Sequence, residues 1–249
     1  MSELSVTVLG CSGSYAAAGE SCSGYLVRSE TTALWVDCGP GTFANLQSHM
    51  RLQAVDALLV SHHHPDHCAE LPVIYNAAKY YMGMEHIRVL ATEGVREVTD
   101  AYGESSDLFG WEMVKDSSQA RVGDIDVLFS RTDHPVETLA MRFESGGKSI
   151  VYTSDTGRGW ALAALSRDVN RPAPDLVVGE GTLLAATDDP GIPHVSAAWL
   201  AADANDVGAG QLVVTHVPPG SDPADHLTEA GEVFQGDVAV ARTGATFYA

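Results

Sequence analysis

Four histidines and one aspartate occupy positions 62, 63, 64, 66 and 67, one residue beyond the apolar run Ala57–Val60. Imidazole nitrogens and carboxylate oxygens are ligands that suit zinc, manganese and iron in proteins. So many of these groups within six positions are hard to explain as protein core or as ordinary surface. The segment therefore predicts a metal site at the end of a buried strand.

The spacing within this segment divides the side chains between two directions. In an extended chain alternate side chains share a face, so His62 and His64 point together while His63 points away. The proline that follows breaks the strand, which lets Asp66 and His67 turn toward a second metal. We therefore expect room for two ions rather than one.

Short apolar runs of strand length recur along the chain and alternate with segments of helical periodicity. Strands are expected at Val6–Leu9, Gly24–Val27, Ala33–Val36, Ala57–Val60, Ile87–Leu90, Ile125–Phe129, Leu139–Phe143, Ser149–Thr153, Leu176–Val178, Leu212–Val214 and Val238–Ala241. Helices are expected at Thr42–His49, Ala69–Tyr80, Gly94–Tyr102, Gly159–Leu165, Ser196–Asn205 and Pro223–Phe234. This alternation favours layered α/β packing. The segment Gly103–Gly123 is expected to be a surface loop or lid, and the absence of linkers and repeats predicts one domain, 1–249.

Further motifs occur before and after the histidine segment, each at the end of a predicted strand. They are Gly10–Gly13, Val36–Gly39, His134 in Asp133–Pro135, Asp155 in Ile150–Gly157, and His216 in Leu212–His216. Taken in this order, the motifs resemble those of the metallo-β-lactamase superfamily. The resemblance spans nearly the whole chain, and five motifs in the family's order are a specific signal. It implies an α/β fold of the metallo-β-lactamase type, a four-layer αββα sandwich.

The resemblance also implies a ligand set for two metal ions. One ion would be held by His62, His64 and His134, the other by Asp66, His67 and His216, and Asp155 would bridge both. Asp66 is counted among the catalytic residues as well. His63 is left outside the set, as an exposed neighbour or a hydrogen-bond donor to a ligand. His226 and the other histidines outside the motifs are interpreted as ordinary core or surface residues.

These ligand types favour two divalent metal ions without redox duty, zinc first and manganese second. Two such ions can lower the pKa of a water molecule bound between them and present hydroxide to a phosphorus or carbonyl centre. An acidic residue in place of His64, as in the family's flavodiiron branch, would favour redox chemistry instead. The pattern therefore predicts a dinuclear, metal-dependent hydrolase.

The segment Gly191–Ser196 resembles the His-Ser-Thr region of the ribonuclease Z-like phosphodiesterases, whose histidine donates to the phosphate or the leaving oxygen. An imidazolium at His194 could neutralise charge on a transferring phosphate and protonate the departing alkoxide. Alternatively, His194 only precedes a helix for which Ser196 is the N-cap. The branch pattern favours the catalytic interpretation, with Glu180 as a candidate to orient His194.

The acidic balance of the chain limits the size of its substrate. The sequence has 14 basic and 33 acidic side chains, a formal charge of −19, which repels long RNA or DNA. The interval between His67 and His134 has few basic residues and no Gly/Pro-rich arm of the kind that tRNA-processing members carry. The arrangement resembles proteins related to cyclic-nucleotide phosphodiesterases, so we expect a small phosphodiester, specifically a 3′,5′-cyclic nucleotide. Glu70, where that branch often has glycine or aspartate, is expected to reshape the rim.

Three other functions remain open. A tRNA 3′-processing endoribonuclease of the ribonuclease Z type would use the same chemistry on a larger substrate. A glyoxalase II-like thioester hydrolase would use the same ligands, but the tail after His216 is mostly acidic, with Arg242 its only basic residue. A non-catalytic metal-binding protein would keep the fold, although clustered histidines and buried carboxylates cost stability without metal.

The four cysteines, Cys11, Cys22, Cys38 and Cys68, show no CxxC pairing, which indicates neither a disulfide framework nor a structural zinc site. Cys68 directly follows the histidine segment and is the one thiol that could act as a ligand. With no signal-peptide pattern and no apolar stretch of bilayer-spanning length, we expect a cytoplasmic protein without a membrane partner. Dimers are common in this branch, so a homodimer is one expected assembly.

Overall fold

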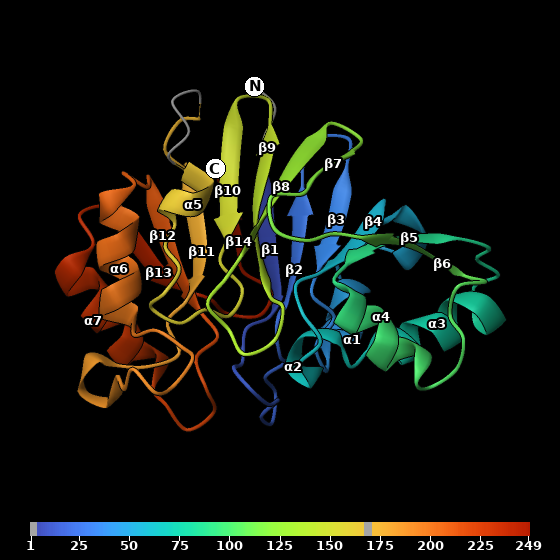
Figure 1. Ribbon diagram of the computed structural model, residues 1–249, viewed down its shortest axis with the longest axis horizontal. Coiled ribbons are helices and arrows are strands. Elements are labelled where there is room, and N and C mark those ends of the chain that lie inside the picture. Colours follow the sequence, from blue (N-terminus) through green and yellow to red (C-terminus); the bar gives the residue numbers. More distant parts are fainter. Residues whose placement is uncertain (1–3, 167–170) are drawn as a thin grey trace.

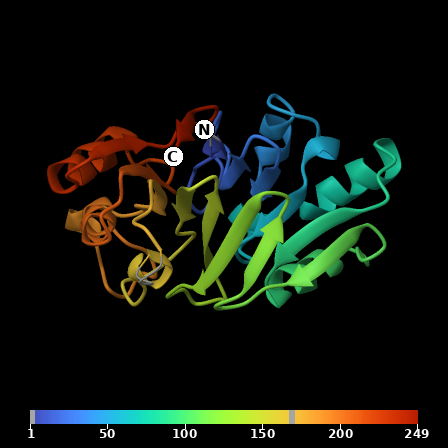
Figure 2. The same cartoon turned by 90° about the horizontal axis from the view of Figure 1, so that it is seen from above.

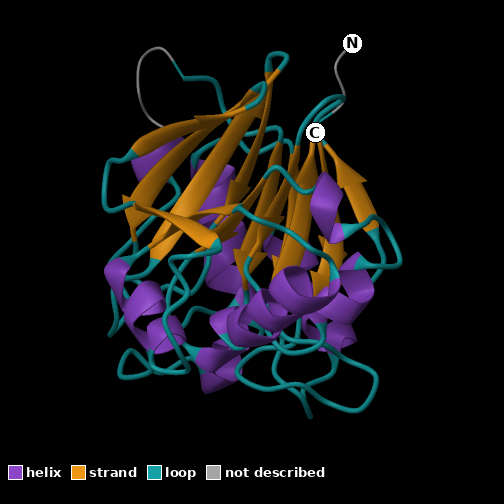
Figure 3. Ribbon diagram, turned by 90° about the vertical axis from the view of Figure 1, so that its right-hand side faces the viewer, coloured by secondary structure: helices purple, strands orange, loops and turns teal. Residues whose placement is uncertain are grey.

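The computed structural model describes residues 4–166 and 171–249. Within these residues, two seven-stranded sheets pack face to face, and helices cover the outer face of each sheet (Figures 1 and 3). The predicted four-layer α/β sandwich is confirmed. The strand order is β14-β1-β2-β3-β4-β5-β6 in the first sheet and β13-β12-β11-β10-β9-β8-β7 in the second.

The first sheet is built mainly from the N-terminal half of the chain. Its strands are β1 (Ser5–Gly10), β2 (Gly24–Arg28), β3 (Ala33–Val36), β4 (Ala57–Val60), β5 (Ile87–Ala91), β6 (Phe109–Met113) and β14 (Thr246–Tyr248). Strands β3 to β6 run parallel, and β14, β1, β2 and β3 pair antiparallel. The last strand of the chain therefore completes the sheet that the first strand begins.

The second sheet comes from the C-terminal half. Its strands are β7 (Gln119–Val122), β8 (Ile125–Arg131), β9 (Leu139–Ser145), β10 (Lys148–Tyr152), β11 (Leu176–Glu180), β12 (Gln211–Thr215) and β13 (Asp237–Val240). Strands β7 to β10 form an antiparallel meander, and β10 to β13 run parallel. Because β8 and β10 both run antiparallel to β9, the carboxyl ends of β8, β10, β11 and β12 lie at one edge of the sheet.

Helices cover the outer face of each sheet. The first sheet carries α1 (Thr42–Leu46), α2 (Pro65–Cys68), α3 (Leu71–Asn76) and α4 (Glu93–Asp100), with a 3₁₀ turn at Leu52–Ala54 and a π turn at Ala77–Tyr81. The second sheet carries α5 (Ala163–Ser166), α6 (Ala197–Asp206) and α7 (Pro223–Val233), with a 3₁₀ turn at Ala185–Thr187. Figure 2 shows these two groups of helices at opposite ends of the molecule.

The alternation of side chains along β4 explains how this arrangement forms. Leu59 packs into the core between the sheets, whereas Leu58 and Val60 pack against the helix layer. A strand that is covered on both faces must be apolar at every position, which is why β4 reads as an uninterrupted apolar run. In the second sheet Ile150 and Val151 divide in the same way between the two layers.

The structure corrects the prediction for Gly103–Gly123. This segment contains β6 and β7, so it is not a structureless loop or lid. Both strands lie at sheet edges, where side chains such as Trp111 and Gln119 remain accessible to solvent. Edge strands of this kind do not need the apolar pattern by which an inner strand is recognised. The helix expected at Ala69–Tyr80 begins at Leu71 and ends in the π turn.

None of the helices in the described part of the chain is both long and apolar enough to cross a membrane.

Candidate metal centre

The predicted ligands lie on loops that leave the carboxyl ends of strands from both sheets. His62 follows β4 of the first sheet. His134 follows β8, Asp155 follows β10, and His216 follows β12 of the second sheet. The packing of the two sheets therefore gathers side chains that are up to 154 positions apart in the sequence.

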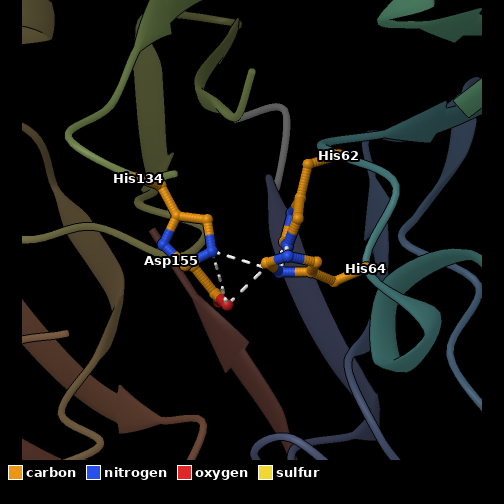
Figure 4. Close-up of side chains that lie close together, drawn as sticks. All are labelled: His62, His64, His134 and Asp155. Atoms are coloured by element: carbon orange, nitrogen blue, oxygen red, sulfur yellow. Dashed lines mark hydrogen bonds and ion pairs between the residues drawn. The ribbon is translucent and has the colours of Figure 1, made fainter. Parts of the chain in front are cut away.

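The first cluster consists of His62, His64, His134 and Asp155, whose candidate ligand atoms all lie within 4.8 Å of one another (Figure 4). His64 Nδ1 is 3.1 Å from His62 Nε2 and 3.1 Å from His134 Nε2. Asp155 Oδ2 is 3.7 Å from His62 Nε2 and 3.9 Å from His134 Nε2. Three imidazole nitrogens and one carboxylate oxygen thus converge on one point.

The second cluster consists of Asp66, His67, Asp155 and His216, and all four residues are buried. His216 Nε2 is 3.2 Å from Asp66 Oδ2 and 3.4 Å from His67 Nε2. Asp155 Oδ1 is 3.2 Å from His67 Nε2 and 3.4 Å from His216 Nε2. Asp155 therefore faces both clusters, one with each carboxylate oxygen.

The outer nitrogens of the histidines are held by acceptors that fix the protonation of the rings. His67 Nδ1 lies 2.8 Å from Asp37 Oδ2, and His134 Nδ1 lies 3.2 Å from the carbonyl oxygen of Pro193. Because a carboxylate and a carbonyl can only accept, both rings must carry the proton on Nδ1. In the neutral form of each ring, Nε2 then carries the lone pair, which is directed into its cluster, and this is the form that binds a metal.

The donor set fits divalent metal ions. Among the described residues, Asp155 Oδ1 accepts no hydrogen bond although it is buried. Burial disfavours a charged imidazole, yet the negative charges of Asp155 and Asp37 raise the pKa of His67 well above its usual value. A buried site that favours positive charge and directs lone pairs inward is suited to a cation.

The same environment affects the other groups. Burial and the neighbouring His67 lower the pKa of His62. Burial also lowers the pKa of His134, to about 4. Burial opposes ionisation of Asp66, but hydrogen bonds from His216 and His67 outweigh it and hold the pKa of Asp66 below its ordinary value. These shifts favour neutral imidazoles in the first cluster and an ionised carboxylate in the second.

Asp37 is a residue for which sequence reasoning assigned no role. Its buried carboxylate accepts hydrogen bonds from the Ser61 backbone N–H at 2.8 Å, from Ser61 Oγ at 3.0 Å and from Tyr152 Oη at 2.7 Å, besides His67. Ser61 Oγ in turn lies 3.0 Å from His62 Nδ1, so one carboxylate supports a histidine of each cluster. In the sequence, Asp37 is visible as the aspartate of the motif that follows β3.

The loop after β1 closes the site from another side. The backbone N–H of Ser14 donates to Asp66 Oδ2 at 2.9 Å. Gly13 passes so close to His216 that a Cβ at this position would lie 2.5 Å from the His216 carbonyl oxygen. His216 itself adopts a left-handed backbone conformation with φ of 59°. Glycine at position 13 is therefore required by close approach to a candidate ligand.

His194 lies beside both clusters. Its ring centroid is 5.5 Å from that of His216, in a stacked arrangement, and 5.5 Å from that of His134. His194 Nδ1 lies 2.9 Å from Oε2 of Glu180, which is buried at the end of β11. Burial disfavours the charged ring, but the hydrogen bond to Glu180 and its charge raise the pKa of His194 to about 9. Ser196 is also the N-cap of α6, so the two interpretations of this segment are compatible.

Other residues singled out in the sequence lie outside the clusters. The His63 side chain packs against Gly94 of α4. Cys68 is a buried free thiol, and burial raises its pKa to about 12. The Glu70 carboxylate accepts hydrogen bonds from the backbone N–H groups of Gly41 and Phe43, so it fastens α1 rather than presenting a free charge.

The chain is similar in sequence and in fold to known proteins. Residues 32–217 match the family described as beta-lactamase superfamily domain. "Probable metallo-hydrolase YhfI" of Bacillus subtilis is 29% identical over 255 residues, covering 97% of this chain and 98% of its own. The crystal structure of YhfI, a metallo-beta-lactamase fold protein, covers 100% of both chains with a TM-score of 0.90 and 27% identity.

Two more distant structures share the fold. The short form of human tRNase Z matches with a TM-score of 0.76 at 18% identity, covering 98% of each chain. Unliganded yeast PDE1 matches with a TM-score of 0.77 at 15% identity, covering 100% of each chain.

Proposed function

Because the chain belongs to the beta-lactamase superfamily domain family, we propose that it is a metal-dependent hydrolase of small phosphodiesters, with a 3′,5′-cyclic nucleotide as the preferred substrate. The observation that carries the proposal is the pair of clusters that share Asp155, with the His194–Glu180 pair beside them. The similarity to YhfI supports a metallo-hydrolase, since that is what its name states.

In this proposal, each cluster holds one divalent ion. The ligands are His62, His64 and His134 for one ion, Asp66, His67 and His216 for the other, and Asp155 for both. When bound, two such ions would activate a water molecule as the nucleophile and neutralise charge on the phosphate. Zinc suits these imidazole and carboxylate donors, and manganese is the second choice.

His194 supplies the proton that the leaving group needs. Glu180 holds the Nδ1 side of the ring, so the proton on Nε2 is the one available for transfer. Cleavage of a phosphodiester expels an alkoxide, and protonating that oxygen as the bond breaks lowers the barrier. The stacking of His194 on His216 keeps this ring close to the second cluster. The carboxyl groups of Asp66 and Asp155 lie in the same site, but their pKa values are lowered, so both are ionised and have no proton to donate.

Charge pairing in the segment between His67 and His134 supports a small substrate. Four of its basic side chains form ion pairs with acidic neighbours: Lys79 with Asp107, Arg88 with Glu112, Arg96 with Asp100, and Arg121 with Asp126. Cations that are already paired add little attraction for a polyanion. Together with the charge of −19, this favours a cyclic nucleotide over a precursor tRNA.

A tRNA 3′-processing endoribonuclease is the second candidate. Its chemistry would use the same clusters and the same His194, and the human tRNase Z short form shares the fold. The two functions differ in the size of the substrate, so a direct comparison of rates separates them. Cleavage of a precursor tRNA as efficient as that of a cyclic nucleotide would contradict the argument from charge.

The first experiment combines elemental analysis with hydrolysis of bis(p-nitrophenyl) phosphate by wild type, Asp66→Ala and His49→Ala. His49 is exposed and lies outside both clusters, so its variant serves as the matched control. We expect about two metal ions per chain in wild type and control, with metal-dependent turnover that Asp66→Ala loses. Cyclic nucleotides and a precursor tRNA are then compared. A metal-loaded wild type that hydrolyses no phosphodiester would overturn the proposal and direct the search to thioesters.

A further inference from the structure

The hydrogen bonds behind the second cluster single out Thr182. This residue follows Glu180 by two positions, in the loop after β11, and is buried. Its Oγ1 lies 2.9 Å from His216 Nδ1 and 2.5 Å from Glu180 Oε2. Thr182 therefore stands between a candidate metal ligand and a buried carboxylate.

The direction of these hydrogen bonds follows from what each group can do. The Glu180 carboxylate can only accept, so the Thr182 hydroxyl donates its single proton to Glu180. Thr182 Oγ1 can then only accept from His216, which requires the proton on His216 Nδ1. The lone pair of His216 is thereby placed on Nε2, the atom that faces Asp66 and Asp155.

Glu180 is at the same time the partner of His194. It accepts the His194 Nδ1–H at 2.9 Å, and it also accepts the backbone N–H of Thr156, one position after Asp155. The rings of His194 and His216 stack with an interplanar angle of 26°. His194 and His216 therefore share one carboxylate, directly in one case and through Thr182 in the other.

We propose that Thr182 is a positioning residue that couples His216 of the second metal site to the Glu180–His194 pair. The inference rests on the proposed function in that His216 holds a metal and His194 donates a proton. The hydroxyl does two things at once: it selects the metal-binding tautomer of His216 and it holds Glu180 for His194. Loss of the hydroxyl would disturb both, whereas loss of the threonine methyl group would disturb neither.

Two matched variants separate the hydroxyl from the rest of the side chain. Thr182→Val keeps the shape and removes the hydroxyl, and Thr182→Ser keeps the hydroxyl and removes the methyl group. Zinc affinity is measured by competition with a chromogenic chelator, which does not depend on turnover. We expect Thr182→Val to lower the zinc affinity of the site that contains His216 about 10- to 100-fold, the usual effect of losing such a partner. Thr182→Ser should keep a zinc affinity close to that of wild type. The kcat of Thr182→Val should likewise be lower than the kcat of wild type and of Thr182→Ser.

A second readout addresses the tautomer itself. In zinc-loaded wild type, nitrogen-15 NMR should find the proton of His216 on Nδ1, in slow exchange with water because Thr182 accepts it. In Thr182→Val this proton should exchange faster. If Thr182→Val fails to fold, the wild-type spectrum still decides, because a His216 without a proton on Nδ1 would overturn the proposal.

Equal zinc affinity in Thr182→Val and wild type would overturn the coupling, and so would equal loss in both variants, which would indicate packing rather than hydrogen bonding. Failure of the proposed function has a different signature. In that case wild type would hydrolyse no phosphodiester, while the difference in zinc affinity between the valine and serine variants would persist.

Discussion

At the scale of single residues, Asp37 shows how one buried carboxylate supports both clusters. It accepts hydrogen bonds from Ser61, His67 and Tyr152, and each of these groups offers a proton to it. An amide at this position would present its own N–H donors to neighbours that need an acceptor. We therefore expect even a conservative substitution of Asp37 to lower the stability of the protein and its affinity for metal.

We predict that Asp37→Asn lowers the free energy of unfolding by about 2–3 kcal/mol, because buried donors lose their acceptor. Zinc affinity should fall about 10- to 100-fold, since the Nδ1 proton of His67 is no longer fixed. Urea unfolding and chelator competition measure the two effects. The same substitution at half-exposed Asp126, whose carboxylate pairs with Arg121 at the surface, should cost less than about 1 kcal/mol. Similar losses in both variants would refute the role of Asp37.

For His194, we predict that His194→Ala lowers kcat about 10²- to 10⁴-fold, the range for loss of a general acid. Bound metal should stay unchanged, because the seven proposed ligands remain in place. Elemental analysis and steady-state kinetics on the same preparation test both statements. His63→Ala is the control, since His63 packs against Gly94 outside the clusters. If His194→Ala loses a metal ion, His194 is a ligand instead.

The candidate ligands could be predicted from the sequence because each lies in a motif at a strand end. Asp37 and Thr182 could not be given roles in the same way. Their function depends on which atoms they meet across the fold, and Tyr152 and His216, which they contact, are 115 and 34 positions away. The motif after β3 marks Asp37 as an aspartate at a strand end, but neither it nor the threonine after β11 identifies the partner across the fold.

At the scale of elements, Asp124 joins turns that belong to different sheets. It lies in the turn between β7 and β8 and accepts hydrogen bonds from Ser29 and Thr32, in the turn between β2 and β3. Its other oxygen accepts from Ser145 at the end of β9. One carboxylate thus fastens the first sheet to the second, at strand ends opposite to those that carry the clusters.

This arrangement predicts a dependence of stability on pH. Hydrogen bonds from Ser29 and Thr32 hold the pKa of Asp124 well below its ordinary value. A carboxyl group with a lowered folded-state pKa stabilises the fold above its unfolded pKa of about 3.9, and this contribution is lost as the pH falls further. Because Asp124 lies near the surface, where solvent weakens its interactions, we expect Asp124→Asn to lower the free energy of unfolding by about 1 kcal/mol at neutral pH and by progressively less below about pH 4. A pH-independent difference in urea unfolding would contradict this account.

Prediction of the strands succeeded for the inner strands and for the edge strand β13, which was expected at Val238–Ala241, but it missed the edge strands β6, β7 and β14. The inner strand β4 is apolar at all four positions because both of its faces are covered. In β6 only Phe109 is buried, and in β7 only Val122, so neither shows a periodic pattern. Their existence follows from pairing with β5 and β8 respectively, which local sequence does not reveal.

At the scale of the whole molecule, the clusters join the two sheets. The first sheet supplies His62, His64, Asp66 and His67 from the segment after β4, and the second supplies His134, Asp155 and His216. Metal binding to such a shared site favours only the folded arrangement, because the unfolded chain does not bring these groups together.

We therefore predict that removing the metal ions with a chelator lowers the thermal unfolding midpoint, and that added zinc restores it. At a free zinc concentration 100 times the dissociation constant, each site would contribute about 2.7 kcal/mol. Calorimetry at several zinc concentrations measures the effect. The ligand variant Asp66→Ala should respond less than His194→Ala, which keeps all proposed ligands. An unfolding midpoint independent of zinc would contradict metal binding across the sheets.

The shared position of Asp155 has a consequence for the life of the protein in a cell. A protein molecule without its metal ions would unfold locally between the two sheets more often. Proteases cleave chains that unfold in this way. Copies that lack their ions would then be removed sooner than copies that hold them. The population that persists would be enriched in chains able to turn over substrate, so the supply of metal would set how much of the enzyme is present as well as how fast each copy works.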